Sequence, residues 1–393
     1  MQNIPLSIPN FEGNEKKYVD DAILQGWVST GGAYIDKFEE QLQEFLNAPK
    51  VVACQSGTSA LHLSLIECGV QPGDAVIVPA LTFIAAVNPV KYLFASPVFM
   101  DCDDSLCMDP VKLNRFCEEE CVFLDGQLIL KQSKKTVKAI VIVHVFGNMA
   151  DMESIMKIAK KYNLSVIEDA TEALGTRYVS GKYFGKMAGT IGEFGAFSFN
   201  GNKIITTGGG GAVTASNIEK AKHIKYLSTQ SKDDPVFYLH NEVGYNYRMT
   251  NVQAAIGVAQ MEELNEFISR KQLNYDKYSK LFDGSEYVTL MKFREETESN
   301  CWFYSLCINR DLIKTQLKDI IAILQQKGIQ TRAIWGLINE QKPYVNDIAY
   351  RIERAKKYAD SVINIPSGTQ LTEDQITYVA NEINNLMREL ANG

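Results

Sequence analysis

From about residue 58 to residue 215, short apolar runs alternate with segments of helical periodicity. Uninterrupted apolar strands separated by helices are typical of a largely parallel sheet covered on both faces. Helices are predicted over residues 58–69, 84–94 and 152–162, and strands over residues 75–78, 98–100, 139–145, 165–168 and 195–198. The sequence therefore predicts an α/β fold.

An interruption of this alternation lies at about residues 110–135. It contains a helical stretch and then Asp125-Gly126 between two apolar runs, a pattern that predicts a β-hairpin. From the residues alone, we interpret this insertion as a surface hairpin without a chemical role.

The chain beyond residue 251 changes in character. Residues 252–281 predict one long helical region or two, and the remainder mixes strands (288–291, 303–308) with helices (313–327, 373–390). We therefore expect a large domain over residues 1–255, which includes the insertion, and a smaller α+β domain over residues 256–393.

Composition and charge exclude several classes of protein. The formal net charge of −7 argues against a nucleic-acid partner, because proteins that bind nucleic acids usually carry a basic face. No run reaches the ~18 consecutive apolar residues of a membrane helix, and the N-terminus lacks the basic and then apolar pattern of an export signal. We expect a cytoplasmic protein. Its eight cysteines and four histidines lack metal-ligand spacing, so no metal site is expected.

The segment Ser56-Gly57-Thr58-Ser59 precedes the first predicted helix. The free N–H groups and the positive dipole end of a helix suit a phosphate, and Gly57 allows close approach of its backbone. The Thr58 hydroxyl is a further donor. Taken alone, the segment is more often an ordinary N-cap formed by Ser56 or Thr58.

Asp169 follows the predicted strand at residues 165–168. It therefore lies at the carboxyl end of a strand, where ligands collect in open α/β sheets. A buried carboxylate is costly unless a cation pairs with it, and a protonated pyridine nitrogen is such a cation. The alternative is a helix N-cap for the turn at residues 170–174, and the motif alone leaves both interpretations open.

Lys203 lies in a short Gly-rich segment between a predicted strand and the four glycines at residues 208–211. A lysine that reaches into a pocket loses solvation, which lowers its pKa and makes the neutral amine available for imine chemistry. Taken alone, a solvated loop lysine is the ordinary interpretation.

Together, a phosphate site, a strand-end aspartate and a lysine are what a protein supplies to pyridoxal 5'-phosphate. Their chain order here is that of the fold type I pyridoxal phosphate enzymes. The sequence resembles the sugar-nucleotide aminotransferases of the DegT/DnrJ/EryC1/StrS family. The matching segments are GWVSTG (26–31), SGTSAL (56–61), PALTF (79–83), VHVFG (143–147), EDA (168–170), FSFNGNK (197–203) and GYNYRM (244–249).

The resemblance implies a role for each matching residue. Lys203 would form the Schiff base with the cofactor and then move the proton between the amino-donor carbon and the cofactor carbon. Asp169 would pair with the pyridine nitrogen, and Phe83 would stack on the ring. The phosphate would be held by Gly57, Thr58 and Ser198.

Three further implications follow from the same resemblance. Asn246 matches a residue that reaches the phosphate of the neighbouring subunit's cofactor, which implies a homodimer with shared active sites. Glu172 departs from the Gln of many members, and as a cofactor contact beside a phenolic oxygen it would have to be protonated or hydrogen-bonded. Relatives with histidine in place of the lysine are dehydratases, so Lys203 indicates an aminotransferase.

Two regions resemble one branch of the family, which acts in legionaminic acid and bacillosamine synthesis. They are the insertion and the segments at residues 328–337 and 342–344. This similarity implies that L-glutamate aminates C4 of a UDP-linked 2-acetamido-4-keto-6-deoxyhexose, for bacterial surface-polysaccharide synthesis. The alternatives are a GDP-4-keto-6-deoxymannose (perosamine-type) substrate, a C3 keto sugar, or a non-catalytic protein that retains the fold.

Two candidate substrate contacts complete the expectation. The planar guanidinium of Arg332 suits a nucleotide diphosphate or the donor carboxylate, although a surface arginine at a strand end is an equal alternative. His144, at the end of a predicted strand, is either a substrate contact or a core histidine with satisfied hydrogen bonds.

Overall fold

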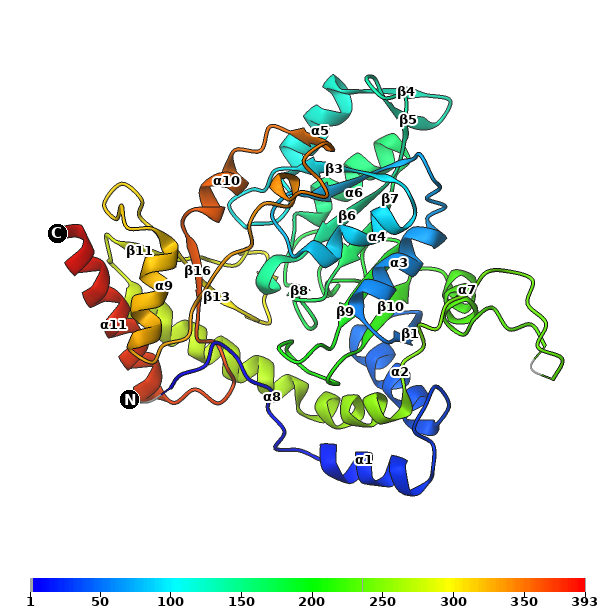
Figure 1. Cartoon of the computed structure of the whole chain (residues 1–393), viewed down its shortest axis with the longest axis horizontal. Helices are drawn as coiled ribbons and strands as arrows, with labels where there is room; N and C mark the ends of the chain where they lie inside the picture. Colours follow the sequence, from blue (N-terminus) through cyan, green and yellow to red (C-terminus); the bar gives the residue numbers. More distant parts are fainter. Residues whose placement is uncertain (1–2, 235, 393) are drawn as a thin grey trace.

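The computed structural model describes residues 3–234 and 236–392. Within them, a ten-stranded sheet forms the centre of the molecule, with helices on both faces (Figure 1). In spatial order its main path is β1 (Lys50–Cys54), β10 (Gly211–Ala215), β9 (Phe194–Ser198), β7 (Ser165–Asp169), β6 (Thr136–Val143), β2 (Ala75–Pro79), β3 (Ser96–Met100) and β15 (Ile348–Tyr350).

The strands from β9 to β15 are parallel, and β1 and β10 are antiparallel to their neighbours. The predicted α/β fold with a largely parallel sheet is therefore confirmed. The insertion forms the hairpin β4 (Cys121–Leu124) and β5 (Gln127–Leu130), and β5 pairs with the start of β6. The hairpin thus extends the sheet.

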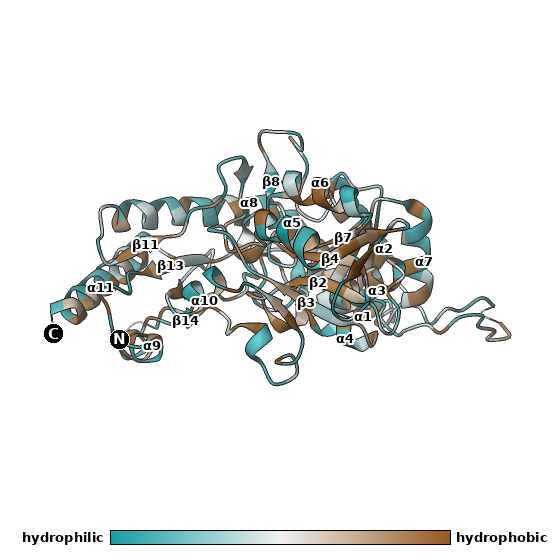
Figure 2. Cartoon of the chain, turned by 90° about the horizontal axis from the view of Figure 1, so that it is seen from above, coloured by the Kyte–Doolittle hydropathy of each residue, from teal (hydrophilic) through white to brown (hydrophobic). Residues whose placement is uncertain are grey.

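Both faces of this sheet are apolar because its strands are covered on both sides. Along β2, Ile77 contributes to the core on one face and Val78 to the core on the other. The first face is covered by α2 (Ala33–Leu46), α5 (Pro110–Glu119), α6 (Met152–Tyr162) and part of α8 (Asn251–Phe282); the second is covered by α3 (Gly57–Glu67), α4 (Asn88–Tyr92) and α7 (Ile218–Ser228). Apolar residues accordingly concentrate on the strands (Figure 2).

A smaller antiparallel sheet has its own apolar core. Its order is β11 (Val288–Leu290), β13 (Tyr304–Ile308), β16 (Val362–Ile365) and β14 (Arg332–Ala333). Its core includes residues of α9 (Leu317–Gln326), α11 (Glu373–Asn392) and the last turns of α8. In Figure 1 the single helix α8 runs from beneath the large sheet to the smaller one.

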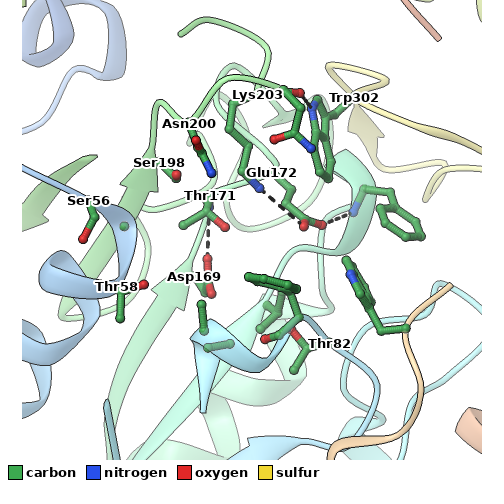
Figure 3. Close-up of a pocket in the computed structure, with 18 of the residues that line it drawn as sticks. Ser56, Thr58, Thr82, Asp169, Thr171, Glu172, Ser198, Asn200, Lys203 and Trp302 are labelled. Carbon is green, nitrogen blue, oxygen red and sulfur yellow. Dashed lines mark hydrogen bonds and ion pairs between the residues drawn. The ribbon is translucent and has the colours of Figure 1, made fainter. Parts of the chain in front are cut away.

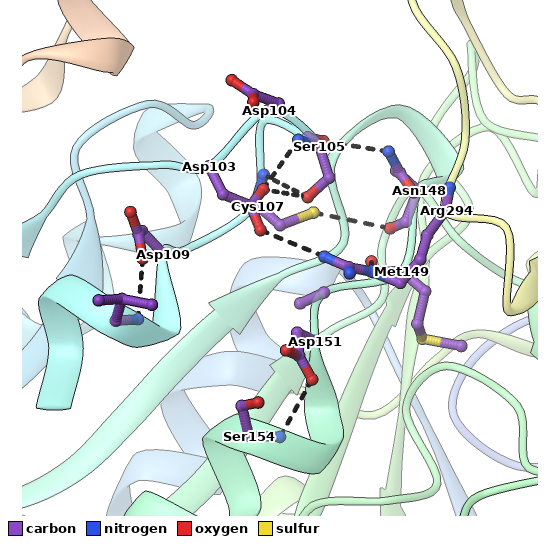
Figure 4. A network of polar contacts seen from close by, with 12 residues as sticks. Asp103, Asp104, Ser105, Cys107, Asp109, Asn148, Met149, Asp151, Ser154 and Arg294 are labelled. Atoms are coloured by element: carbon purple, nitrogen blue, oxygen red, sulfur yellow. Dashed lines mark hydrogen bonds and ion pairs between the residues drawn. The ribbon is translucent and has the colours of Figure 1, made fainter. Parts of the chain in front are cut away.

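The boundary predicted between residues 255 and 256 falls inside α8, and β15, from the C-terminal part of the chain, pairs with β3 of the large sheet. The two-domain division stays a prediction. A polar network also joins the C-terminal part of the chain to the large sheet (Figure 4). The Arg294 guanidinium donates to the Met149 carbonyl and to Asp103, and the Arg294 backbone N–H donates to the Asn148 Oδ1.

The predicted bounds differ most from the structure in three elements. The helix expected at 84–94 is divided into η1 (Ile84–Ala86) and α4, because Pro89 lacks an N–H and cannot continue the helical hydrogen bonds of the residues before it. The strand expected at 139–145 ends at Val143, since Phe146 has a left-handed φ of 56°. The helix expected at 313–327 begins only at Leu317.

The remaining elements are α1 (Glu15–Leu24), η2 (Val145–Gly147), β8 (Arg177–Tyr178), β12 (Thr297–Glu298), η3 (Ile338–Glu340) and α10 (Arg354–Ala359). Of the helices in the described residues, none combines the length and apolarity needed to cross a membrane.

Candidate active site

A cavity of about 400 Å³ lies at the carboxyl ends of β7 and β9 (Figure 3). Its floor comes from the large sheet and the start of α3, and its far wall comes from the smaller sheet and the segment before β13. The topology explains this position, because parallel strands bring their carboxyl ends to one edge. Of the predicted site residues, the cavity lining includes Gly57, Thr58, Phe83, Asp169, Glu172, Ser198, Lys203 and Arg332.

The N-terminus of α3 borders the cavity. Ser56 is its N-cap, since its Oγ accepts a hydrogen bond from the Ser59 N–H at 3.1 Å. The amides of Gly57 and Thr58 have no carbonyl one turn back to bond, as at every helix start. Capping and anion binding are therefore compatible here: Ser56 caps the helix, and the next two amides are available to an anion.

Gly57 is closely packed against the end of β9. A Cβ at this position would lie 2.9 Å from the Ser198 Cβ and 3.0 Å from the Thr171 Cγ2. Because Gly57 has no side chain, the start of α3 can lie directly against Ser198 and Thr171.

Replacing Gly57 by alanine is expected to weaken cofactor binding about tenfold to a hundredfold, because overpacking of this kind costs about 1–3 kcal/mol. Titration of the cofactor-free protein with pyridoxal 5'-phosphate measures the change. Gly368→Ala is the control, since its Cβ would meet no atom within 4 Å. Unchanged affinity in Gly57→Ala would contradict the phosphate-site assignment.

Asp169 is the last residue of β7 and is only 4% exposed. Burial raises the pKa of its carboxyl, and the hydrogen bond from Thr171 together with the charges of Lys203 and His144 partly offsets this rise. Its Oδ1 accepts the Thr171 N–H at 3.1 Å. Among the described residues, no cationic nitrogen lies within 4 Å of this carboxylate. It is a buried acid that lacks its counter-charge.

Lys203 extends from a loop toward the same cavity. Its Nζ lies 3.6 Å from the Glu172 Oε1 and 4.2 Å from the centre of the Trp302 ring. The backbone N–H of Lys203 donates to the Asn200 carbonyl at 3.0 Å, which closes a tight turn. The structure therefore brings the amine and two carboxyl groups, those of Asp169 and Glu172, to one cavity.

Glu172 is 4% exposed, and its Oε2 accepts the N–H of Phe146 at 2.8 Å. Burial raises the pKa of this carboxyl to about 7, against the lowering effects of Lys203 and the Phe146 N–H. Since Phe146 occupies Oε2, a proton on Glu172 belongs on Oε1, the oxygen that faces Lys203.

Glu172→Gln is expected to stabilise the cofactor-free protein at high pH. Because the folded pKa of about 7 exceeds the ordinary 4.5, the stability that Glu172 contributes is complete below pH 4.5 and is lost as pH rises through 7. Glutamine stays neutral, so it should gain up to about 3 kcal/mol above pH 7. Thermal unfolding from pH 5 to 9 measures this, with the exposed Glu286→Gln as control. Parallel curves for wild type and Glu172→Gln would contradict a neutral Glu172.

Two predicted site residues do not line this cavity. His144 is fully buried, and its Nε2 lies 2.8 Å from Glu168 while its Nδ1 accepts the Ala150 N–H. Its hydrogen bonds match the alternative of a satisfied core histidine, and a contact with the substrate stays a prediction. Asn246 is exposed, in a bridge to Thr229.

Sequence reasoning missed the aromatic wall. Trp302 and Phe303 stack at 4.0 Å, and Trp335 lies 4.6 Å from the Phe146 ring, measured between ring centres. All four line the cavity. The local signal is that Trp302 and Trp335 each stand in a short apolar run, which does not distinguish a cavity wall from a core.

The family model of the DegT/DnrJ/EryC1/StrS aminotransferases matches residues 9–384. The chain belongs to this family. It is 35% identical to the GDP-perosamine synthase of Escherichia coli O157:H7, with 98% of each chain covered, and 34% identical to that of Caulobacter vibrioides, with 96% and 97% covered. A DegT/DnrJ/EryC1/StrS aminotransferase from Brucella abortus has the same fold, with a TM-score of 0.85, 25% identity and 95% of each chain covered.

This aminotransferase uses pyridoxal 5'-phosphate, the cofactor of its family. The cavity fits that group on independent grounds. A pyridinium nitrogen is the cation that the buried Asp169 lacks, and the α3 N-terminus suits a phosphate.

Proposed function

We propose that this sugar aminotransferase transfers the amino group of L-glutamate to C4 of a UDP-linked 2-acetamido-4-keto-6-deoxyhexose. The observation that carries the proposal is the meeting of the Lys203 amine, the buried Asp169 and the α3 N-terminus at one cavity. The choice of UDP and of the acetamido group is supported by the resemblance of the insertion and of residues 328–337 and 342–344 to one branch of the family.

The chain's own groups perform the following work. Gly57, Thr58 and Ser198 would hold the phosphate, and Asp169 would keep the pyridine nitrogen protonated. The bound cofactor stabilises negative charge on the donor carbon during transfer. Lys203 would hold the cofactor covalently and, once freed from it, would move the proton to and from the reacting carbon.

Phe83 forms one wall and is 56% exposed within the single chain, so it is free to cover a ring. Arg332, on β14, also lines the cavity, and among the described residues no carboxylate lies within 4 Å of its guanidinium. We assign it to an anionic group of the substrate, either the diphosphate or the donor carboxylate.

A homodimer is part of the proposal. Asn246 is exposed and outside its own cavity, as a residue that serves a neighbour would be. The nearby segment of residues 236–239 exposes four large apolar side chains at 58–75%. Sedimentation velocity should give twice the chain mass. A mixture of the Asn246→Asp and Lys203→Ala variants should recover activity only if the two variants exchange subunits and Asn246 of one subunit serves the active site of the other.

A second nucleotide has support of its own. Two relatives with 34–35% identity are GDP-perosamine synthases, which favours a GDP-linked 4-keto-6-deoxymannose. We rank this substrate second, because the acetamido-sugar branch matches the insertion.

The deciding experiment offers UDP-, GDP- and dTDP-linked 4-keto-6-deoxy sugars with glutamate, and NMR identifies the aminated carbon. We expect the UDP-acetamido sugar to give the highest kcat/KM, with nitrogen at C4. Preferred turnover of the GDP sugar would establish the second candidate, and nitrogen at C3 would refute both.

A further inference from the structure

A second buried lysine lies behind the aromatic wall. Lys271, on α8, is 3% exposed, and no carboxylate of the described residues lies within 4 Å of its Nζ. Its Nζ donates to the carbonyl oxygens of Trp302, at 2.9 Å, and Ser367. Its own carbonyl accepts the Tyr304 hydroxyl at 2.7 Å. One side chain thus joins α8, the segment before β13 and the segment after β16.

An unpaired buried ammonium is costly, so its retention requires a reason. Burial lowers the pKa of Lys271 to about 7. A neutral amine still carries two N–H donors, which equals the number of carbonyl oxygens it contacts. The geometry therefore suits Lys271 in either protonation state, as a clamp on two backbone carbonyls.

Trp302 is held at both ends. Its backbone N–H donates to Asn300 at 3.0 Å, its carbonyl accepts from Lys271, and its indole Nε1 donates to the Asn202 carbonyl at 2.7 Å. The preceding residue, Cys301, has a left-handed φ of 51°. This strained conformation persists only where surrounding contacts over-determine it.

The indole also touches the loop that carries Lys203. The Trp302 ring centre lies 4.2 Å from the Lys203 Nζ, and its bond to Asn202 fixes the residue next to Lys203. In Figure 3 the indole stands beside the lysine side chain. A continuous path of contacts thus runs from α8 through Trp302 to the lysine.

We propose that Lys271 is a positioning residue that fixes Trp302, and through it the loop of Asn202 and Lys203, in the geometry that proton transfer requires. Lys271 touches neither the cavity nor the reacting atoms; it acts by holding the Trp302 backbone. The proposal rests on the aminotransferase activity and not on the choice of sugar.

The first test follows Trp302 itself in the cofactor-free full chain. Trp27→Phe and Trp335→Phe leave Trp302 as the single tryptophan, and acrylamide quenching of its fluorescence reports its exposure. Lys271→Met should raise the quenching constant at least about twofold, because the freed segment opens. An unchanged quenching constant would overturn the proposal.

The second test measures the half-reaction of the holoenzyme with glutamate alone, so a wrong sugar assignment leaves it intact. Lys271→Met should lower the single-turnover rate about tenfold to a hundredfold, with little change in the glutamate concentration at half-saturation. Trp302→Phe keeps a ring but removes the indole N–H, and it should slow the reaction similarly. The double variant should be no slower than the slower single one, because both act through one contact.

Lys277→Met is the matched control: it removes a partly exposed lysine of the same helix, paired with Glu373 at 3.3 Å, and should leave the rate unchanged. If Lys271→Met does not fold, Lys271→Gln, which keeps one amide donor group, takes its place in both assays. Two outcomes would show that Lys271 has a purely structural role. They are rate losses that multiply in the double variant, and a lowered melting temperature with an unchanged rate.

Discussion

Lys203→Ala is expected to abolish transamination, with turnover reduced by at least about 10⁴-fold. If the proposed roles of Lys203 hold, the variant loses both the covalent link to the cofactor and the group that moves the proton, and the second loss alone is worth about 10²–10⁴. No other lysine lines the cavity within the described residues, so no neighbour replaces it. Amino-sugar formation and the glutamate half-reaction both measure the effect.

The variant should still bind pyridoxal 5'-phosphate, because the α3 N-terminus and Asp169 are intact. Borohydride should not attach the bound cofactor covalently to this variant, so denaturation should still remove the cofactor after the treatment. Lys222→Ala, on the exposed face of α7, is the control and should behave as wild type. Substantial turnover in Lys203→Ala would refute its catalytic assignment.

Asp169→Asn is expected to have the second largest effect, in opposite directions on activity and stability. Loss of the carboxylate removes the proposed partner of the pyridinium, and deletion of such a preorganised electrostatic contact costs about 10²–10³ in kcat. Burial raises the pKa of Asp169 above its ordinary 3.8, so in the cofactor-free protein its stabilising contribution is lost as pH rises through the folded value.

In the absence of the cofactor, the Asp169→Asn variant should therefore unfold at a higher temperature than wild type at neutral pH. This difference in unfolding temperature should shrink at acidic pH. Thermal unfolding of the cofactor-free proteins, beside kcat of the loaded ones, measures both effects. Asp125→Asn, in the exposed turn of the β4–β5 hairpin, should change neither. An Asp169→Asn variant with normal kcat would show that its charge has no part in the reaction.

Much of the large sheet could be predicted because its signals are local. Apolar runs gave β2, β3, β6, β7 and β9, and helical periodicity gave α3 and α6. The short β15 was missed, since three residues carry no clear period, and its pairing with β3 joins segments about 250 residues apart. The antiparallel β10 begins at the last of the glycines at 208–211, and a run of glycines is more typical of a loop than of a strand.

The sequence by itself determined the cofactor side of the site. Ser56, Asp169 and Lys203 each follow a strand end or begin a helix, and a parallel sheet necessarily gathers such positions at one edge. Their chain order, together with the resemblance to the family, was therefore sufficient to expect them at one site.

Only the tertiary structure decided what faces and supports them. The packing of the smaller sheet and α8 places Trp302 and Trp335 in the wall of the cavity and Lys271 behind that wall. These residues are about 70–130 positions from Lys203 in the sequence. The same packing buried His144 against Glu168 and placed a hydrogen-bonding backbone N–H beside Glu172. Such contacts depend on how two apolar cores meet, and no periodicity within either segment encodes that geometry.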